Sequence, residues 1–393
     1  MNIVRSFITA LMLVIPVLAF AQDPIDPIAA LAERIKSGQA KLEFEPKQGY
    51  LSSLLKHLNV PVSSQTLVFS KTSLQSEGIT PKSPRALYFN DDVYVAWVQG
   101  SSSIEIMSVD PKRGSIFYAL GQENDGRPAF EHVTGHICSV CHHVQGLKTF
   151  VPRLLFSSVI PDATGNVEGT FPFETTDQTP MEERWGGWYV TGKHGAQKHL
   201  GNIVMKTPMS PIGDLKGIDY SKSSNLVDLG TRFDTSKYLS PHSDIVALMV
   251  FAHQVDLHNL IALAGAKADG DPRETGETLV QALLFSGAAA FKEPVSGSSN
   301  FADEFSSRGP RDSRGRSLRE FDLKTRLFRY PLSYVIYTKP FDAMPENVKA
   351  YVYRRLTEVL TGKDQSKDFA HLSAADRRAI LEILRETKPD FPR

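Results

Sequence analysis

The stretch of sequence that decides the fold is residues 86–120, which read ALYFNDDVYVAWVQGSSSIEIMSVDPKRGSIFYAL. Short runs rich in β-branched and aromatic residues alternate here with clusters of asparagine, aspartate, glycine and serine. The strand-like runs are residues 86–89, 93–99, 104–109 and 115–120. Runs of this length, separated by such turn clusters, predict a meander of hairpins. We therefore expect a small antiparallel sheet in this region.

On either side of the meander the sequence has a helical period. Upstream, residues 28–35 and 51–58 show helical spacing, and downstream four longer stretches do the same. The downstream helices are expected at residues 243–264, 275–290, 347–360 and 373–387. Residues 297–315 are polar, glycine-rich and basic, which predicts a surface loop. Between the sheet and the long helices, residues 127–240 are rich in glycine, proline and threonine and are expected to be mostly irregular.

Composition limits the classes of partner. The chain has 393 residues, of which 41% are hydrophobic and 22% charged, and its 44 lysines and arginines equal its 44 aspartates and glutamates. A balanced charge gives no basic surface for nucleic acid or for an anionic membrane, so neither partner is expected.

The N-terminus has the pattern of a secretory signal peptide. A short basic start ending at Arg5 precedes an apolar run over residues 7–20, and Ala19-Phe20-Ala21 forms a cleavage site. We expect residues 1–21 to be removed and the protein to be periplasmic or secreted. The alternative is an uncleaved N-terminal anchor. No later apolar stretch is expected to form an integral membrane span.

Residues 138–142 read CSVCH and form a C-x-x-C-H motif, the attachment signature of c-type haem. Two thiols three positions apart can add to the two vinyl groups of one haem, and the histidine that follows can bind the iron from the proximal side. Cys138 and Cys141 are the only cysteines of the chain. The motif predicts one covalent haem c on Cys138 and Cys141, with His142 as the proximal iron ligand.

Two other interpretations of the motif stay open. A zinc ion could bind Cys138 and Cys141 together with His142 or His143. The two thiols could also act as a bare redox pair. An exported protein favours haem, because in bacteria haem is attached to this motif outside the cytoplasmic membrane.

The distal iron ligand has three candidates. His194 and His199 lie in the irregular segment near tryptophan and tyrosine residues, where a ring nitrogen can turn toward iron. Met344 precedes Pro345 and offers a thioether. His253 and His258 fall within one predicted helix, where a separation of five positions places them on different faces. We expect one of them to be a buried histidine with ordinary hydrogen-bond partners. An open distal position is the remaining possibility.

The motif makes the chain resemble c-type cytochromes, and residues 341–345 (FDAMP) resemble the end of small cytochrome c domains, where a Met-Pro supplies the distal ligand. Four further segments resemble a family of large exported bacterial cytochrome c domain proteins with one C-x-x-C-H motif. They are YFNDDVY at 88–94, ERWGGWY at 183–189, SPHSDI at 240–245 and LSAADRR at 372–378. The resemblance implies haem binding and electron transfer, with no substrate specified.

Together these observations predict an α+β fold, in which a small antiparallel β region is followed by a mainly α-helical, loop-rich, cytochrome c-like haem region. The expected parts are the signal peptide at 1–21, an N-terminal region with the β-meander at 22–126, a haem-attachment region at 127–240 and a helical region at 241–393. The expected function is single-electron transfer with an unidentified redox partner protein. Alternatives are a peroxidase-like haem enzyme or small-ligand sensor with an open iron site, and a haem-stabilised partner-binding protein; the sequence does not decide whether the protein is an enzyme.

Overall fold

The computed structural model describes residues 26–110, 113–126, 128–133, 142, 153–167, 173–209, 215 and 217–393. The expected signal peptide and both motif cysteines, Cys138 and Cys141, lie outside the described residues. His142 lies within them.

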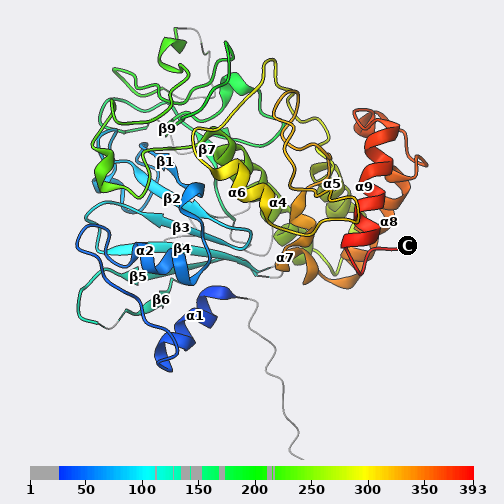
Figure 1. The fold of residues 1–393 in the computed structure, drawn as a ribbon, viewed down its shortest axis with the longest axis horizontal. Coiled ribbons are helices and arrows are strands. Elements are labelled where there is room, and N and C mark those ends of the chain that lie inside the picture. The colour runs from blue at the N-terminus through cyan, green and yellow to red at the C-terminus, as the bar shows by residue number, and fades with distance from the viewer. Residues whose placement is uncertain are drawn as a thin grey trace, which may run out of the picture.

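The centre of the fold is an antiparallel sheet of seven strands in the order β6-β5-β4-β3-β2-β1-β9 (Figure 1). Its strands are β1 (Thr66–Val68), β2 (Arg85–Phe89), β3 (Val93–Trp97), β4 (Ser103–Asp110), β5 (Gly114–Gly121), β6 (Phe130–His132) and β9 (Trp188–Tyr189). The four strands β2 to β5 form the predicted meander of hairpins. The sheet is larger than expected, because β1 and two strands from the irregular segment, β6 and β9, extend it.

Both faces of the sheet are buried, so alternate residues of one strand enter two different cores. On β3, Tyr94 and Ala96 face the core that contains the C-terminal helices. Val95 and Trp97 face a second core, formed with two N-terminal helices. These are α1 (Pro27–Lys36) and α2 (Leu51–His57), both close to their predicted positions.

Helix α4 (Ile245–Ala266) covers the other face of the sheet and is the main helix of the larger core. It is apolar on every side, as expected of a helix that is surrounded by protein. Within the described part of the chain it is the one helix long and apolar enough to cross a membrane, yet 83% of that window is buried inside the protein. We therefore describe it as a core helix.

Further helices surround α4 (Figure 1). They are α5 (Pro272–Leu283), α6 (Phe301–Ser307), α7 (Lys339–Asp342), α8 (Glu346–Leu360) and α9 (Ala374–Thr387). Helices α5, α6 and α7 contact α4 directly, α8 packs on α5 and α9 packs on α8. Ser373 and Asp376 form a reciprocal capping box at the start of α9.

Two predictions about these helices need correction. Helix α5 ends at Leu283, because Phe285 and Gly287 adopt positive φ angles of 59° and 70° that break the helix. The predicted loop at 297–315 contains α6, whose Phe301 and Phe305 are buried in the core. The α+β class is confirmed by the sheet and the helices together.

The described residues of the segment 127–240 are mostly irregular, as predicted. Besides β6 and β9, this segment contains a small pair of strands, β7 (Ser157–Ser158) and β8 (Phe173–Glu174), and a few 3-10 turns. It passes over the upper edge of the sheet and the start of α4 in Figure 1.

Candidate functional site

His142, the last residue of the C-x-x-C-H motif, lies over the outer part of the sheet. Its ring packs on Phe117 of β5 with 4.8 Å between ring centroids. Its Nδ1 lies 2.7 Å from the backbone carbonyl oxygen of Arg153. An N–H at Nδ1 donates this hydrogen bond, so the lone pair of the neutral ring is on Nε2.

The surroundings of His142 keep its ring neutral. Burial is the largest cause that lowers the pKa of His142, and the neighbouring Arg85 and Arg153 lower it further. Both arginines are paired, Arg85 with Glu105 and Arg153 with Glu174, which limits their effect. A neutral imidazole is the form that binds a metal ion.

A second contact connects this part of the chain to α4. The side-chain amide of Asn259 makes two hydrogen bonds with the backbone of Leu154, accepting from its N–H and donating to its carbonyl, both at 2.9 Å. The carbonyl that holds His142 belongs to the preceding residue, Arg153. His142 therefore has the outer support typical of a metal-binding histidine, in which one ring N–H donates to a backbone carbonyl and orients the ring. It fits the role of a proximal iron ligand.

His194 and His199, two of the predicted distal ligands, lie together elsewhere in the fold. Both are buried, and their ring centroids are 4.6 Å apart. His194 is held by a 2.8 Å contact between its Nδ1 and the carbonyl of Gln197, and His199 packs against Trp185. Within the described residues, His194 Nε2 and both ring nitrogens of His199 have no hydrogen-bond partner.

The histidine pair and His142 are not brought together. Thr191, three residues before His194, pairs with Asp244 at the start of α4, whereas the segment that holds His142 is attached to Asn259. These two positions on the helix are about 22 Å apart at 1.5 Å per residue. Burial, with a smaller contribution from His194, lowers the pKa of His199 to about 3, so both rings are neutral near pH 7.

Met344, the third predicted distal ligand, is buried between α7 and α8 in the larger core. Asn347 at the start of α8 donates a 2.7 Å hydrogen bond to the carbonyl of Ala268, just beyond the end of α4. Met344 is therefore near the same end of α4 as Asn259. No described contact joins it to His142.

Helix α4 carries an arrangement that sequence reasoning missed. His253 contacts Asp177 Oδ2 through Nδ1 at 2.5 Å and Ser333 Oγ through Nε2 at 2.7 Å. A Ser-His-Asp set with these roles is a hydrolase signature. Ser333, however, is fully buried and its Oγ also accepts the N–H of Val335, so no substrate can reach it. The set connects α4 to two loops, and no pattern could reveal it, because its members are 76 and 80 positions apart in sequence.

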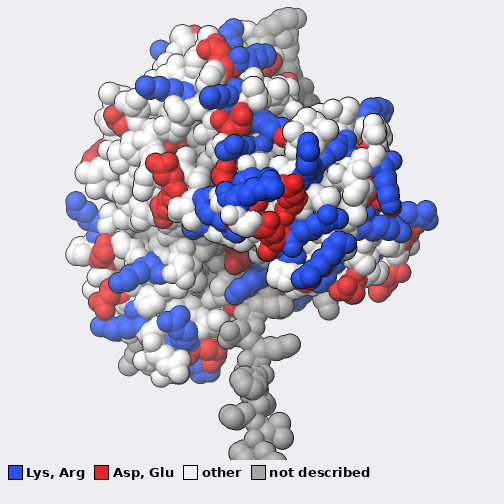
Figure 2. All heavy atoms as spheres, turned by 45° about the vertical axis from the view of Figure 1, so that its right-hand side comes forward, with Lys and Arg blue, Asp and Glu red and all other residues white. Residues whose placement is uncertain are grey.

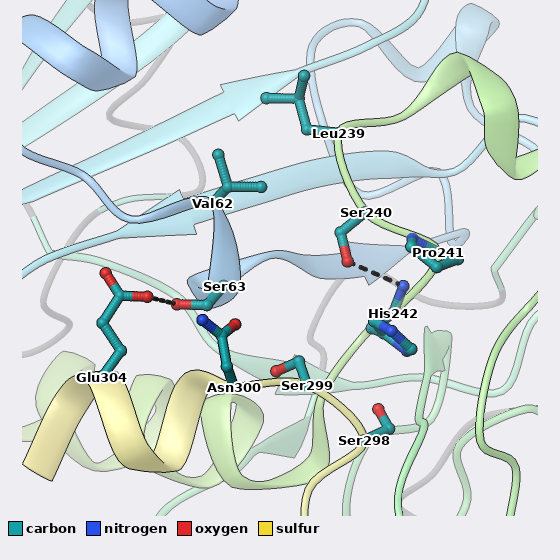
Figure 3. A pocket seen from close by; sticks show the side chains of 10 residues that line it. All are labelled: Val62, Ser63, Leu239, Ser240, Pro241, His242, Ser298, Ser299, Asn300 and Glu304. Atoms are coloured by element: carbon teal, nitrogen blue, oxygen red, sulfur yellow. Dashed lines mark hydrogen bonds between the residues drawn. The ribbon is translucent and has the colours of Figure 1, made fainter.

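A polar hollow of about 530 Å³ opens at the other end of α4 (Figure 3). Ser63 donates a 2.5 Å hydrogen bond to Glu304 across one side of it, and on the other side the Oγ of Ser240 accepts the N–H of His242. His242 itself contacts the carbonyl of Val227 at 3.0 Å. The hollow is open, and most of its polar side chains are paired with each other or with neighbouring residues such as Thr191 and Asp244, so it defines no chemistry.

The face formed by the C-terminal helices is dense in charge (Figure 2). Basic and acidic side chains are interleaved there as ion pairs. Those between α9 and the segment that joins α6 to α7 are Arg314 with Glu382, Arg316 with Glu382, and Arg326 with Asp376. Such exposed pairs contribute little to stability and do not by themselves define a binding surface.

Among the described residues, no group of three or more His, Cys, Asp or Glu side chains is arranged to hold a metal ion. The C-x-x-C-H site includes residues outside that part of the chain. Comparison with known proteins gives no assignment, because no family model, curated protein or solved structure matches the chain.

Proposed function

We propose that this protein is an exported c-type cytochrome that binds one haem covalently and transfers single electrons. The C-x-x-C-H motif at residues 138–142 carries the proposal. The hydrogen bond between His142 Nδ1 and the carbonyl of Arg153 supports it, because this bond leaves Nε2 free to bind iron.

When bound, the haem would supply a one-electron couple at its iron. The protein's own residues would do the rest. Cys138 and Cys141 would attach the group, His142 would bind the metal, and Phe117 would pack against the histidine ring. The burial of the His142 ring against the sheet would keep water from this ligand and so limit the reorganisation that accompanies electron transfer.

Haem staining after denaturing electrophoresis tests the attachment. The purified protein should keep a haem-stained band, and the double variant Cys138→Ala/Cys141→Ala should lose it. The variant Cys138→Ser/Cys141→Ser is a more polar control for any effect on folding. A wild-type band that releases its haem, or a protein that carries stoichiometric zinc instead, would refute haem c at this motif.

Carbon monoxide distinguishes the carrier from the open-site alternatives. A carrier with a protein-derived distal ligand should bind carbon monoxide slowly or not at all in its reduced form. Rapid binding together with turnover of peroxide would favour the peroxidase-like enzyme.

Export is tested by the intact mass of the protein recovered from the periplasm. We expect a chain that begins at Gln22, after cleavage behind Ala21. A chain that still begins at Met1 would indicate a retained anchor. The redox partner would be another exported protein. We do not expect the protein to bind nucleic acid, because its basic and acidic residues are equal in number.

A further inference from the structure

His258 is the one histidine of α4 whose outer ring nitrogen has no described partner. The side chain is 1% exposed, and its Nδ1 lies 2.9 Å from the hydroxyl of Tyr94 on β3. Its Nε2 is buried without a hydrogen-bond partner among the described residues. Leaving a buried polar atom unpaired costs about 1–3 kcal/mol, so a protein keeps one only where something else compensates.

The orientation of His258 is fixed by a chain of buried polar groups. Tyr94 accepts a 2.8 Å hydrogen bond from Gln254 Nε2, and Gln254 Oε1 accepts a 2.6 Å hydrogen bond from the hydroxyl of Tyr334. Gln254 has both amide hydrogens bonded, because it also donates to the carbonyl of Asn90. This network ends at His258. The Tyr94 hydroxyl, which already accepts from Gln254, donates to Nδ1 when the ring carries its N–H on Nε2. Metal binding at Nε2 requires the other tautomer, in which the Nδ1–H donates to the Tyr94 oxygen and Nε2 carries a lone pair without a partner among the described residues.

His258 and His142 stand over one row of the same sheet face. Phe117 on β5, which packs against His142, pairs with Met107 on β4, and Met107 pairs with Tyr94. Tyr94 packs edge-on against His258, with ring centroids 5.9 Å apart. Two strand spacings separate Phe117 from Tyr94, which is about 10 Å. Phe117 and Tyr94 therefore lie on either side of Met107, with His142 packed on the first and His258 of α4 packed on the second.

A second, independent connection supports this proximity. Asn259 follows His258 on α4 and holds the backbone of Leu154, whose neighbour Arg153 accepts the hydrogen bond of His142. Metal–imidazole bonds are about 2 Å long, so two axial histidines have their binding nitrogens about 4 Å apart. Phe117 and Tyr94, the sheet residues that the two histidines contact, are about 10 Å apart, a separation that leaves room for a flat group between the two rings.

We propose that His258 Nε2 is the distal iron ligand of the haem whose proximal ligand is His142. This inference rests on the proposed function. It replaces His194, His199 and Met344 as the preferred distal ligand, because the unpartnered nitrogen of His258 is on the same sheet face as His142. The polar chain behind Tyr94 would be the outer support that orients this ligand, as the Arg153 carbonyl is for His142.

The test is the absorption spectrum of purified full-length protein with its haem attached. Wild type should be low-spin in both oxidation states, and near-infrared magnetic circular dichroism should give the bis-histidine signature without any substitution. His258→Ala should become high-spin and bind carbon monoxide in the reduced form. Added imidazole should restore the low-spin spectrum. His258→Met should remain low-spin with a more positive midpoint potential, because a thioether favours reduced iron.

The matched controls are His199→Leu and Met344→Leu, which should keep the wild-type spectrum. If either of these becomes high-spin while His258→Ala does not, the distal ligand is that residue and the inference is wrong. A high-spin wild type, or one with a histidine–methionine signature, also overturns it while leaving the covalent haem intact. Loss of the haem-stained band in wild type is a different result, because it refutes the proposed function itself.

Discussion

Replacing Asp244 should destabilise the protein far more than replacing a second aspartate with the same local role. Asp244 is the N-cap of α4 and is fully buried. Its Oδ1 accepts the N–H groups of Val246 and Ala247 at 2.8 and 3.3 Å. Its Oδ2 accepts three more hydrogen bonds at 2.8 Å, from the N–H groups of Ser298 and Ser299 and from the Ser299 hydroxyl. One carboxylate thus joins the helix to the segment before α6.

The expected loss follows from these contacts. Losing an N-cap aspartate costs about 1–2 kcal/mol. Two backbone donors, from Ser298 and Ser299, lose their acceptor as well, at about 1–3 kcal/mol each. The Ser299 hydroxyl can rotate toward another acceptor, so its lost hydrogen bond adds little. Since both serines line the open hollow of Figure 3, water can reach them, and we expect a total near the lower end, about 3–5 kcal/mol. The free energy of unfolding of a natural protein is about 5–15 kcal/mol in total, so a loss of this size is severe.

Urea unfolding followed by far-UV circular dichroism measures the effect as a shift of the midpoint at an unchanged slope. The control is Asp271→Ala. Asp271 is the N-cap of α5, where it accepts the N–H of Arg273 and is exposed, so its loss should cost about 1 kcal/mol. If Asp244→Ala is too unstable to purify, Asp244→Asn and Asp271→Asn give the same comparison. Equal losses at the two positions would refute the argument from the buried contacts.

Three further outcomes follow from single sites. Gly187→Ala should destabilise the protein more than Gly100→Ala in the same urea assay. Both glycines have positive φ angles, 81° and 74°, and such a conformation costs any other residue about 1–2 kcal/mol. A methyl group at position 187 would also lie 2.7 Å from the nearest side-chain atom, whereas the space around position 100 is open. His199→Leu should flatten the dependence of stability on pH. Burial lowers the pKa of His199 in the folded state to about 3, so below the unfolded value of about 6.5 the unfolded chain binds the proton first. The stability of the wild type therefore decreases as the pH is lowered, by about 2.7 kcal/mol at pH 4.5. A variant with the wild-type pH profile would contradict this. Asn259→Ala should speed amide exchange at Leu154, which loses both of its side-chain hydrogen bonds, and unchanged exchange would show that Asn259 does not hold that segment.

The sequence predicts those parts of the fold that have a local period. Strands β2 to β5 are short runs rich in β-branched and aromatic residues with turn residues between them, and α4, α8 and α9 begin and end within a few residues of their expected positions. The extensions of the sheet have no such signal. Strand β9 has two residues and joins the sheet by pairing Tyr189 and Trp188 with Leu67 and Val68, far away in sequence. A strand of that length is defined by its partner and not by its own pattern.

The same distinction applies to the candidate site. The C-x-x-C-H motif is local, so it identifies His142 from the residues beside it. The contacts that decide what each histidine can do are not local. His258 meets Tyr94 across 164 positions, and His253 meets Ser333 across 80. The sequence places the two histidines on different faces of one helix and predicts burial for one of them, whereas the fold buries both. Only the fold shows that His253 has both ring nitrogens bonded, whereas His258 Nε2 has no partner among the described residues.

His258 lies in the helix on which the larger core depends, so effects on the fold and effects at the proposed iron site must be told apart. Helix α4 is at once the central core helix and the element that carries His258 and Asn259. A substitution that loosens α4 at its N-cap, about 21 Å from the proposed iron ligand His258 at 1.5 Å per residue, should therefore lower stability and electron transfer without removing that ligand. Loss of function in an α4 variant is then poor evidence for a role at the iron. Spin state and rescue by imidazole are better evidence, because a residue that only supports the fold will not give a high-spin iron that free imidazole restores.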